Sequence, residues 1–250
     1  DVPANSVELA ALATTLNAML DRLDDSITRQ NQFVSDAAHE LRSPLAGVRG
    51  QLEVNVHHPD APDRAASEEE MLAETIRMQE LVDDLLLLAR ADSGRLERPN
   101  TPVDLDDLVL EETARIDRAD QLAVNVEQVS GAQVTGDATQ LRRVIRNLLD
   151  NATRHAGSSI WVELSEDAGG ARLAVVDDGP GVPAGEVESV FDRFTRLDES
   201  RSRDAGGSGL GLAISREIVE HHGGTIRVDT EHAGGARFVV EIPFHEPPSP

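Results

Sequence analysis

The sequence lacks several residue types, and each absence narrows what the chain can do. It contains no cysteine, which excludes disulfide bonds and thiolate catalysis and is compatible with a reducing compartment. Tyrosine is absent and aromatic residues make up only 2 %, so we expect cores of Leu, Val, Ile and Ala. No run approaches the roughly 18 apolar residues of a membrane span, and the longest candidate is LLLLA at 85–89. We therefore expect a soluble chain with neither a span nor a signal peptide.

Positive charge is also scarce. The chain carries 46 acidic against 23 basic residues, which gives a formal net charge of −23. Such a chain would repel the phosphates of DNA and RNA, so no nucleic-acid partner is expected. Its 250 residues suit about two domains, and 39 % of hydrophobic residues is enough to build their cores.

Hydrophobic spacing in the first part of the chain predicts two long helices. From Val7 to about Val56 apolar residues recur in a coiled-coil-like pattern, which the prolines of HHPDAPD at 57–63 end. A second helix is expected from about Ser67, ending where Gly94 can take a left-handed cap. One hairpin cannot bury two apolar stripes, so we expect an all-α hairpin that pairs with a second copy as a dimeric four-helix bundle.

The pattern changes after residue 97 to short β-rich runs between helices, so we place a domain boundary there. This second domain is predicted to mix α and β structure. Strands are expected at LAVNVEQ, AQVTGD, SIWVELSE, ARLAVVDDG, TIRVDT and ARFVVEIPF. Helices are expected at about 104–117, 137–156 and 209–222.

Two segments of this domain place polar side chains in patterns that suit ligand binding. Asn147 and Asn151 lie four apart and so share one helix face, although two amides alone are more often a solvated polar stripe than a binding site. VVDDGPGVP ends a strand in Asp177, followed by Gly179 and Gly181. Those glycines would let a flat ligand approach the backbone, and the alternative is a tight turn with Asp177 as its acceptor.

A third segment, DAGGSGLGLAIS, sets four glycines directly before a helix. Free amides and the positive helix end would then face a phosphate, although a glycine-rich loop alone is weak evidence. With FDRF at 191–194, the three segments in this order resemble the N, G1, F and G2 boxes of the GHKL ATPase superfamily. More narrowly, they resemble the catalytic and ATP-binding domain of sensor histidine kinases over about residues 102–244.

The resemblance implies an α/β sandwich that binds ATP and Mg²⁺. Asp177 would accept a hydrogen bond from the adenine amino group, and Asn151 would coordinate Mg²⁺ with help from Asn147. A lid is implied at about 192–208, and sequence does not choose which of its arginines neutralises the γ-phosphate. The further implied ligand contacts are Arg154, His155, Gly179, Gly181, Gly207, Gly209, Leu210 and Gly211, with Arg193, Arg196, Arg201 or Arg203 for the γ-phosphate.

Superfamily members that hydrolyse ATP carry a glutamate one helical turn before the Mg²⁺ asparagine. Here that position is Asn147. An amide cannot take a proton from water, so the hydrolytic base is missing while the metal ligand is kept. We therefore expect the domain to pass the γ-phosphoryl group to another acceptor.

The stretch SDAAHELRSPLAGVRG at 35–50 offers that acceptor. A zinc-protease motif would need a second histidine where this chain has Ser43, and a lone histidine is ordinarily a surface residue. Beside a nucleotide domain, however, the stretch resembles the phosphoacceptor H-box of histidine kinases. The resemblance implies that His39 is the nucleophile, that Glu40 orients its ring or takes its other proton, and that Ser43 holds water for dephosphorylation of a partner. Pro44 is expected to bend the helix just after His39.

These interpretations divide the chain into three parts. Residues 1–28 resemble the C-terminal part of a HAMP linker, 29–96 a dimerisation and histidine phosphotransfer domain, and 97–246 the catalytic and ATP-binding domain. We predict a protein histidine kinase that phosphorylates His39 and then an aspartate of a response-regulator receiver domain, in two-component signal transduction. It would be the cytoplasmic portion of a membrane sensor, with membrane contact only through segments missing from this chain.

The alternative is a non-catalytic dimeric adaptor with a vestigial nucleotide domain. A nucleotide pocket that no longer has a function should have lost at least one critical side chain by substitution. The chain keeps His39, Asn151, Asp177 and the glycine-rich loop together, which argues against decay.

Overall fold

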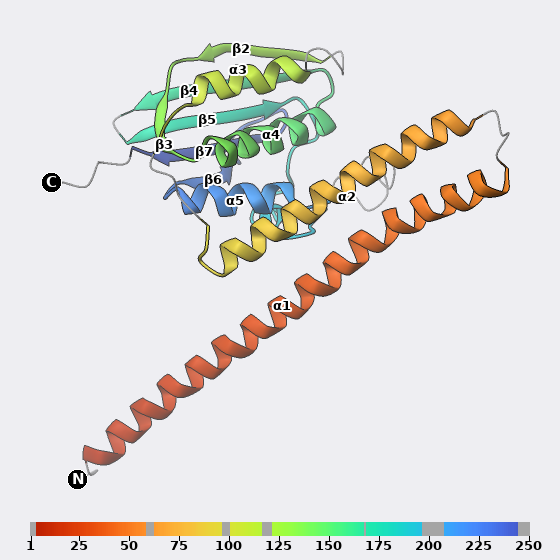
Figure 1. Ribbon diagram of the computed structural model, residues 1–250. Helices are drawn as coiled ribbons and strands as arrows, with labels where there is room; N and C mark the ends of the chain where they lie inside the picture. The colour runs from red at the N-terminus through yellow and green to blue at the C-terminus, as the bar shows by residue number, and fades with distance from the viewer. Residues whose placement is uncertain are drawn as a thin grey trace. The chain divides into compact units, whose positions relative to one another are not determined.

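Figure 1 shows the computed structural model of the chain, which describes residues 4–58, 63–96, 101–116, 122–167, 169–196 and 208–244. Contacts between residues group the chain into two units, 1–81 and 82–250. Within the described ranges, no helix is both long and apolar enough to cross a membrane.

The first unit is a helical hairpin. Helix α1 spans Ala4–His57 and helix α2 spans Arg64–Asp92, of which the part up to residue 81 belongs to this unit. Close to the turn, Gln51 Nε2 donates a hydrogen bond to Glu70 at 2.8 Å, which ties the two helices together. Both predicted helices are confirmed. Helix α1 runs through Pro44 without a break, and a bend at that residue stays a prediction.

Much of the apolar surface of this hairpin faces outward. Met19 is 61 % exposed and Leu45 is 60 % exposed, whereas Met71 and Leu81 are buried. Apolar surface of this extent is stable in water only when another surface covers it. The exposed apolar side chains of the hairpin include Leu12, Leu16, Met19, Leu20, Leu23, Ile27, Val34, Leu45, Leu52, Leu72 and Ile76.

The second unit is built on a five-stranded sheet with the strand order β2-β4-β5-β7-β6. Strand β2 (Ala123–Val129) runs parallel to β4 (Ser159–Asp167), and the other neighbours pair antiparallel. The remaining strands of this sheet are β5 (Gly170–Asp177), β6 (Thr225–Val228) and β7 (Arg237–Pro243). The predicted strands are confirmed. A short strand that the sequence did not predict, β1 (Thr101–Asp104), pairs with β3 (Gln133–Gly136).

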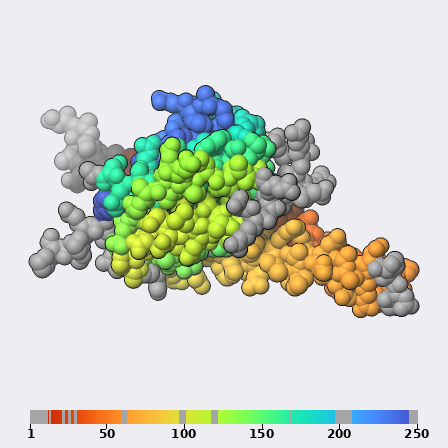
Figure 2. Space-filling view, turned by 90° about the horizontal axis from the view of Figure 1, so that it is seen from above, coloured from red at the N-terminus to blue at the C-terminus, as the bar shows by residue number. Residues whose placement is uncertain are grey.

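Three helices cover one face of this sheet (Figure 1). Helix α4 (Ala138–His155) contacts both α3 (Leu105–Ile116) and α5 (Gly211–His221), and it also packs on β5. A short 3₁₀ helix, η1 (Ser189–Phe191), contacts α5. In Figure 2, helix α3 and its neighbours in the chain, β1 and β2, are coloured yellow-green and lie on one face of the unit. The result is a two-layer α/β sandwich, as predicted.

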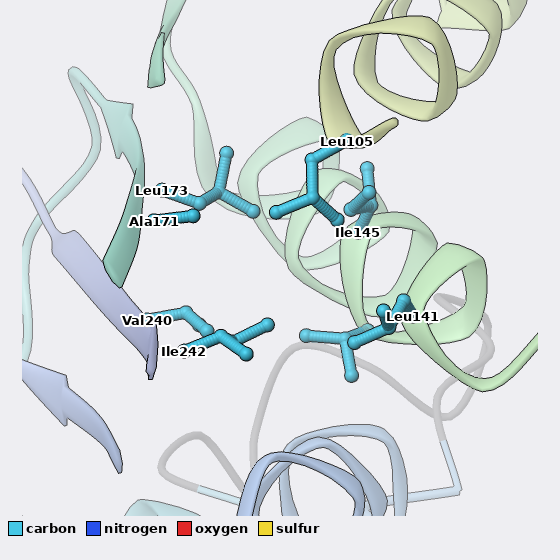
Figure 3. Close-up of a pocket in the computed structure, with 8 residues that line it drawn as sticks. Leu105, Leu141, Ile145, Ala171, Leu173, Val240 and Ile242 are labelled. Atoms are coloured by element: carbon cyan, nitrogen blue, oxygen red, sulfur yellow. The ribbon is translucent and has the colours of Figure 1, made fainter. Parts of the chain in front are cut away.

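An apolar core fills the space between the helices and the sheet. Figure 3 shows Leu141 and Ile145 of α4 facing Leu173 of β5 and Val240 of β7 across a small pocket. All 8 residues that line this pocket are apolar. It therefore offers no hydrogen-bonding group to a base or a phosphate, and a polar ligand has to bind elsewhere in the unit.

One carboxylate is buried between α3 and α4. Glu112 is 3 % exposed and accepts hydrogen bonds from Arg146 at 3.0 and 3.1 Å, from Arg142 at 3.2 Å and from Arg115 at 2.7 Å. Burial by itself would raise the pKa of Glu112, but the bonds from Arg146, Arg115 and Arg142 outweigh it and lower this pKa to about 2. The cluster fixes α3 against the helix that carries both candidate asparagines.

Glu112 should make the stability of the second unit depend on pH. Its pKa is lowered from 4.5 to about 2 on folding, so its contribution is complete above pH 4.5 and is lost as the pH falls toward 2. We expect Glu112→Gln to reduce the free energy of unfolding by about 3 kcal/mol at pH 7 and by roughly half as much at pH 3. Urea titrations followed by the fluorescence of Trp161, the single tryptophan, would measure both values.

The matched control is Glu111→Gln. Glu111 bonds the same Arg142 but its side chain is 60 % exposed, so its removal should cost less than about 1 kcal/mol. An equal cost for Glu112→Gln at pH 3 and pH 7 would contradict the role of the buried carboxylate.

Candidate functional site

Helix α4 positions the two predicted amides. Its N-cap is Asp137, whose Oδ1 accepts hydrogen bonds from the backbone N–H of Thr139 at 2.8 Å and of Gln140 at 3.1 Å. Asn147 and Asn151 are both half-buried, outside the apolar stripe that packs inward. That buried stripe consists of Leu141, Val144, Ile145, Leu148, Leu149 and Ala152.

Asn147 joins α4 to the first turn of α5. Its Nδ2 donates to the carbonyl of Gly211 at 2.9 Å and lies 3.3 Å from Ser215 Oγ. Ser215, which is fully buried, donates its own hydroxyl to the same Gly211 carbonyl at 2.8 Å. The geometry therefore gives Asn147 a contact that the sequence did not suggest, because its amide orients the helix start that follows the glycine-rich loop.

Asn151 lies one turn further along α4. Within the described part of the chain its side chain makes no hydrogen bond, so its oxygen is available to a ligand or a cation. Arg154 and His155 are exposed in the last turn of the same helix. The described residues contain no group of three or more His, Cys, Asp or Glu side chains that could hold a metal ion. A cation here would need oxygen ligands from a bound phosphate beside the Asn151 amide.

Asp177 ends the central strand β5 and is 1 % exposed. Its Oδ1 accepts hydrogen bonds from the backbone N–H of Gly179 at 2.9 Å and of Ala236 at 3.3 Å. In the described ranges no group donates to its second oxygen, Oδ2. The carboxylate is thus fixed in orientation and keeps one acceptor for an N–H group of a ligand.

Two glycines allow the chain to close tightly around Asp177. A Cβ atom on Gly179 would overlap the carbonyl oxygen of His155 at the end of α4. Gly181 has a φ of 76°, and a Cβ there would lie 2.9 Å from the carbonyl oxygen of Gly235. The sequence did not point to Gly235 and Ala236, which support Asp177 from the turn between β6 and β7. The glycine pair in AGGA at 233–236 was the available signal.

The glycine-rich loop is described from residue 208 onward. Gly209 has a φ of 70°, and its carbonyl accepts a hydrogen bond from Phe194 N at 2.9 Å. Leu210 is fully buried at the start of α5, and Gly211 is the first helical residue. The candidates Arg201, Arg203 and Gly207 lie outside the described residues.

Arg193 was a candidate for the γ-phosphate. Its guanidinium forms two hydrogen bonds with Asp92, at 2.9 and 2.6 Å, and approaches Glu217 at 3.4 Å. These carboxylates engage its charge, so the structure does not direct Arg193 to the site around Asp177. Arg196 is described and exposed.

The H-box residues lie in the middle of α1, in the first unit. His39 and Ser43 are exposed and lie four residues apart, which places them on one face of the helix, while Glu40 is half-buried. An exposed imidazole next to a carboxylate can act as a nucleophile toward a ligand carried by another part of the protein.

Comparison with known families matches both units. Residues 29–94 match the His Kinase A (phospho-acceptor) domain, and residues 136–246 match the histidine kinase-, DNA gyrase B- and HSP90-like ATPases. The chain is 41 % identical over 255 residues to the "Probable sensor histidine kinase TcrY" of Mycobacterium tuberculosis, covering 96 % of this chain and 52 % of TcrY. It is 39 % identical over 259 residues to the signal transduction histidine-protein kinase/phosphatase MprB of the same species, covering 98 % of this chain and 51 % of MprB. The chain thus spans about half the length of these relatives.

Solved structures agree with this match. The mycobacterial sensor histidine kinase MprB superposes with a TM-score of 0.52 at 34 % identity, over 58 % of this chain and 97 % of that one. The Acinetobacter baumannii histidine kinase AdeS gives a TM-score of 0.68 at 22 % identity, over 83 % of this chain and 98 % of that one, which supports the fold.

The acceptor oxygen of Asp177 gives the first test of the site. We expect Asp177→Asn to weaken ATP binding by about 1.5–3 kcal/mol, because a charge-assisted hydrogen bond to the adenine amino group is lost. Isothermal titration with ATP and Mg²⁺ would measure the dissociation constant.

Asp167→Asn is the matched control. Asp167 lies at the opposite end of the β4–β5 pair, and among the described residues its carboxylate accepts a hydrogen bond only from the N–H of Gly169. Unchanged ATP affinity in Asp177→Asn, with the control also unchanged, would show that Asp177 does not read adenine.

Proposed function

The chain belongs to the sensor histidine kinases of two-component systems, and from that premise we propose that it transfers the γ-phosphoryl group of ATP to His39. The phosphoryl group then passes to an aspartate of a response-regulator receiver domain. One observation carries the proposal. Asn147 stands where ATP-hydrolysing members of the superfamily have a glutamate, and its amide is bonded to Gly211 and Ser215. Water near the γ-phosphate therefore finds no base at this position, while the nucleotide can still be held.

Nucleotide binding would use groups of α4, of the end of β5 and of the start of α5. Asp177 Oδ2 would accept a hydrogen bond from the adenine amino group, and the Asn151 side-chain oxygen would hold Mg²⁺. Bound Mg²⁺ would neutralise charge on the phosphate oxygens. The backbone amides at the start of α5 would add partial positive charge for the phosphates. The remaining proposed contacts are Arg154, His155, Gly179, Gly181, Arg201, Gly207, Gly209, Leu210 and Gly211.

Transfer to histidine needs a neutral ring nitrogen. The lone pair of His39 forms a bond to the γ-phosphorus while the bond from that phosphorus to the bridging oxygen breaks, and ADP leaves. Glu40 holds or takes the proton on the other ring nitrogen, which keeps the attacking nitrogen basic. The product is a phosphoramidate. A carboxylate of the receiver domain later attacks its phosphorus, the bond from phosphorus to the ring nitrogen breaks, and neutral His39 is restored.

The exposed apolar stripe of the hairpin supports a homodimer. Side chains such as Val34, Leu45 and Leu72 would be buried if a second copy of the hairpin completed a four-helix bundle. We propose the three-part division at 1–28, 29–96 and 97–246, with residues 1–28 as the end of a HAMP linker. The intact protein would then be a membrane sensor whose stimulus reaches His39 along α1.

The kinase proposal is tested by the chemistry of the protein-bound phosphate. After incubation with γ-labelled ATP and Mg²⁺, we expect a label that survives alkali and is lost in acid, as a phosphoramidate should be. His39→Gln should remove this label completely and leave the affinity for ATP within about twofold, because His39 lies outside the nucleotide site. His57→Gln is the matched control, since His57 is also exposed on α1.

Two outcomes would contradict the proposal. A label that is stable in acid and lost in alkali would point to serine or threonine. A folded protein that binds ATP yet never acquires label would favour the adaptor reading.

Dephosphorylation of the partner regulator is a second proposed activity, since MprB carries the description kinase/phosphatase. Ser43 lies one turn after Glu40, and its exposed hydroxyl can hold a water for attack on the aspartyl phosphate. Without the threonine methyl group, its χ1 angle is freer and the water is held less firmly. We expect a modest phosphatase rate that rises in Ser43→Thr and is lost in Ser43→Ala.

The assay follows decay of the purified phospho-regulator with this protein and ADP. Labelling of His39, in which Ser43 has no proposed part, reports whether each variant is folded. Equal phosphatase rates for Ser43→Ala and the unaltered chain would show that another group positions the water.

A further inference from the structure

The loop that follows α4 surrounds the carboxylate of Asp178, the residue after Asp177. Asp178 Oδ1 accepts hydrogen bonds from the backbone N–H of Gly157 at 2.7 Å, of Ser158 at 3.0 Å and of Ser159 at 3.1 Å. Its Oδ2 accepts from the hydroxyl of Ser158 at 2.6 Å and from the Ser158 N–H at 3.1 Å. A single side chain thus holds three consecutive residues.

Every one of these partners is a donor, which matches a carboxylate and not an amide. The hydroxyl of Ser158, followed by the N–H groups of Ser158, Ser159 and Gly157, holds the pKa of Asp178 well below its usual range. The group is therefore ionised at any pH at which the protein works. An asparagine would turn an NH₂ group toward donors on at least one side.

This loop connects the two halves of the nucleotide site. It begins directly after the last turn of α4, where Arg154 and His155 are the proposed contacts to the ribose or the phosphates. Asp178 itself follows the adenine-reading Asp177, and its own N–H donates to the carbonyl of Ser159 at 3.3 Å. Next to it, Gly179 lies against the carbonyl of His155. The Asp178 carboxylate therefore fixes the separation between the end of α4 and the end of β5.

We propose that Asp178 is a positioning residue that locks the ribose–phosphate half of the site to the adenine half. It contacts no nucleotide and acts through the loop 157–159. A ligand that spans both halves binds with higher affinity because of this preorganisation, since no free energy is needed to align the halves when it binds. A ligand that touches only one half gains little. The inference rests on the proposed function, since it concerns how the same site binds ADP and ATP.

The test compares a spanning ligand with a truncated one in the full chain. Dissociation constants for Mg²⁺–ADP and for adenosine are measured by isothermal titration in the unaltered chain and in Asp178→Ala. We expect the dissociation constant for Mg²⁺–ADP to rise in Asp178→Ala while that for adenosine changes little. The ratio of the adenosine dissociation constant to the ADP dissociation constant should therefore fall by about tenfold. A loss of stability alone would not change this ratio in the folded protein.

Two further variants serve as a milder version of the substitution and as a negative control. Ser158→Ala removes only the 2.6 Å bond and keeps the backbone donors, so it should shift the ratio in the same direction by a smaller factor. This variant also stands in for Asp178→Ala if that protein fails to fold. Asp167→Ala is the control. Asp167 accepts a hydrogen bond from the N–H of Gly169 at 2.7 Å and lies at the opposite end of the same strand pair. This variant should leave the ratio unchanged.

The outcomes separate this inference from the proposed function. A ratio that stays the same in Asp178→Ala and Ser158→Ala, whatever their melting temperatures, would overturn the positioning role and leave the kinase intact. An unaltered chain that binds neither ADP nor ATP would instead overturn the proposed function, and this inference with it.

Discussion

Helix α4 has to fit against three neighbours at once, and the whole nucleotide site depends on that fit. On one side Glu112 of α3 accepts hydrogen bonds from Arg142 and Arg146, and on the other Asn147 donates to Gly211 at the start of α5. At its end the carbonyl of His155 lies against Gly179, where no side chain would fit. These contacts fix Asn151 and Asp177 on separate elements of one rigid frame, so that a ligand is bound by groups already in place.

Charge shapes the site as strongly as packing does. A chain with a net charge of −23 repels a nucleotide triphosphate at long range, so attraction has to be local. Several arginines of this unit are already paired with carboxylates, as Arg146 is with Glu112, Arg193 with Asp92 and Arg237 with Glu163. Local positive potential is therefore expected from the backbone amides at the start of α5, from a cation beside Asn151 and from the exposed Arg154 on α4.

The sequence predicted most of the fold because its signals are local. Helical spacing located α1, α2 and α4, and alternating β-branched runs located the sheet, whereas the four-residue strand β1, which contains Pro102, has too short a pattern to be seen. Motifs singled out Asp177 and Asn151 as candidate ligand-binding residues, and that role stays a prediction. The sequence could not reveal hydrogen bonds between distant segments. Examples are the bond from Ala236 to Asp177, the bond from Asn147 to Gly211, and the bonds that Asp178 accepts from the loop after α4. Their residue types are common in turns and helices, and only the fold brings the partners together.

We expect this site to transfer the γ-phosphoryl group of ATP to a side chain and not to water. The most direct measurement is a rapid-quench single turnover that follows ADP, phosphoprotein and inorganic phosphate in the same samples. Our account predicts that ADP and acid-labile phosphoprotein appear together in equal amounts, with inorganic phosphate formed only later. ADP and inorganic phosphate rising together from the start, without phosphoprotein, would contradict it.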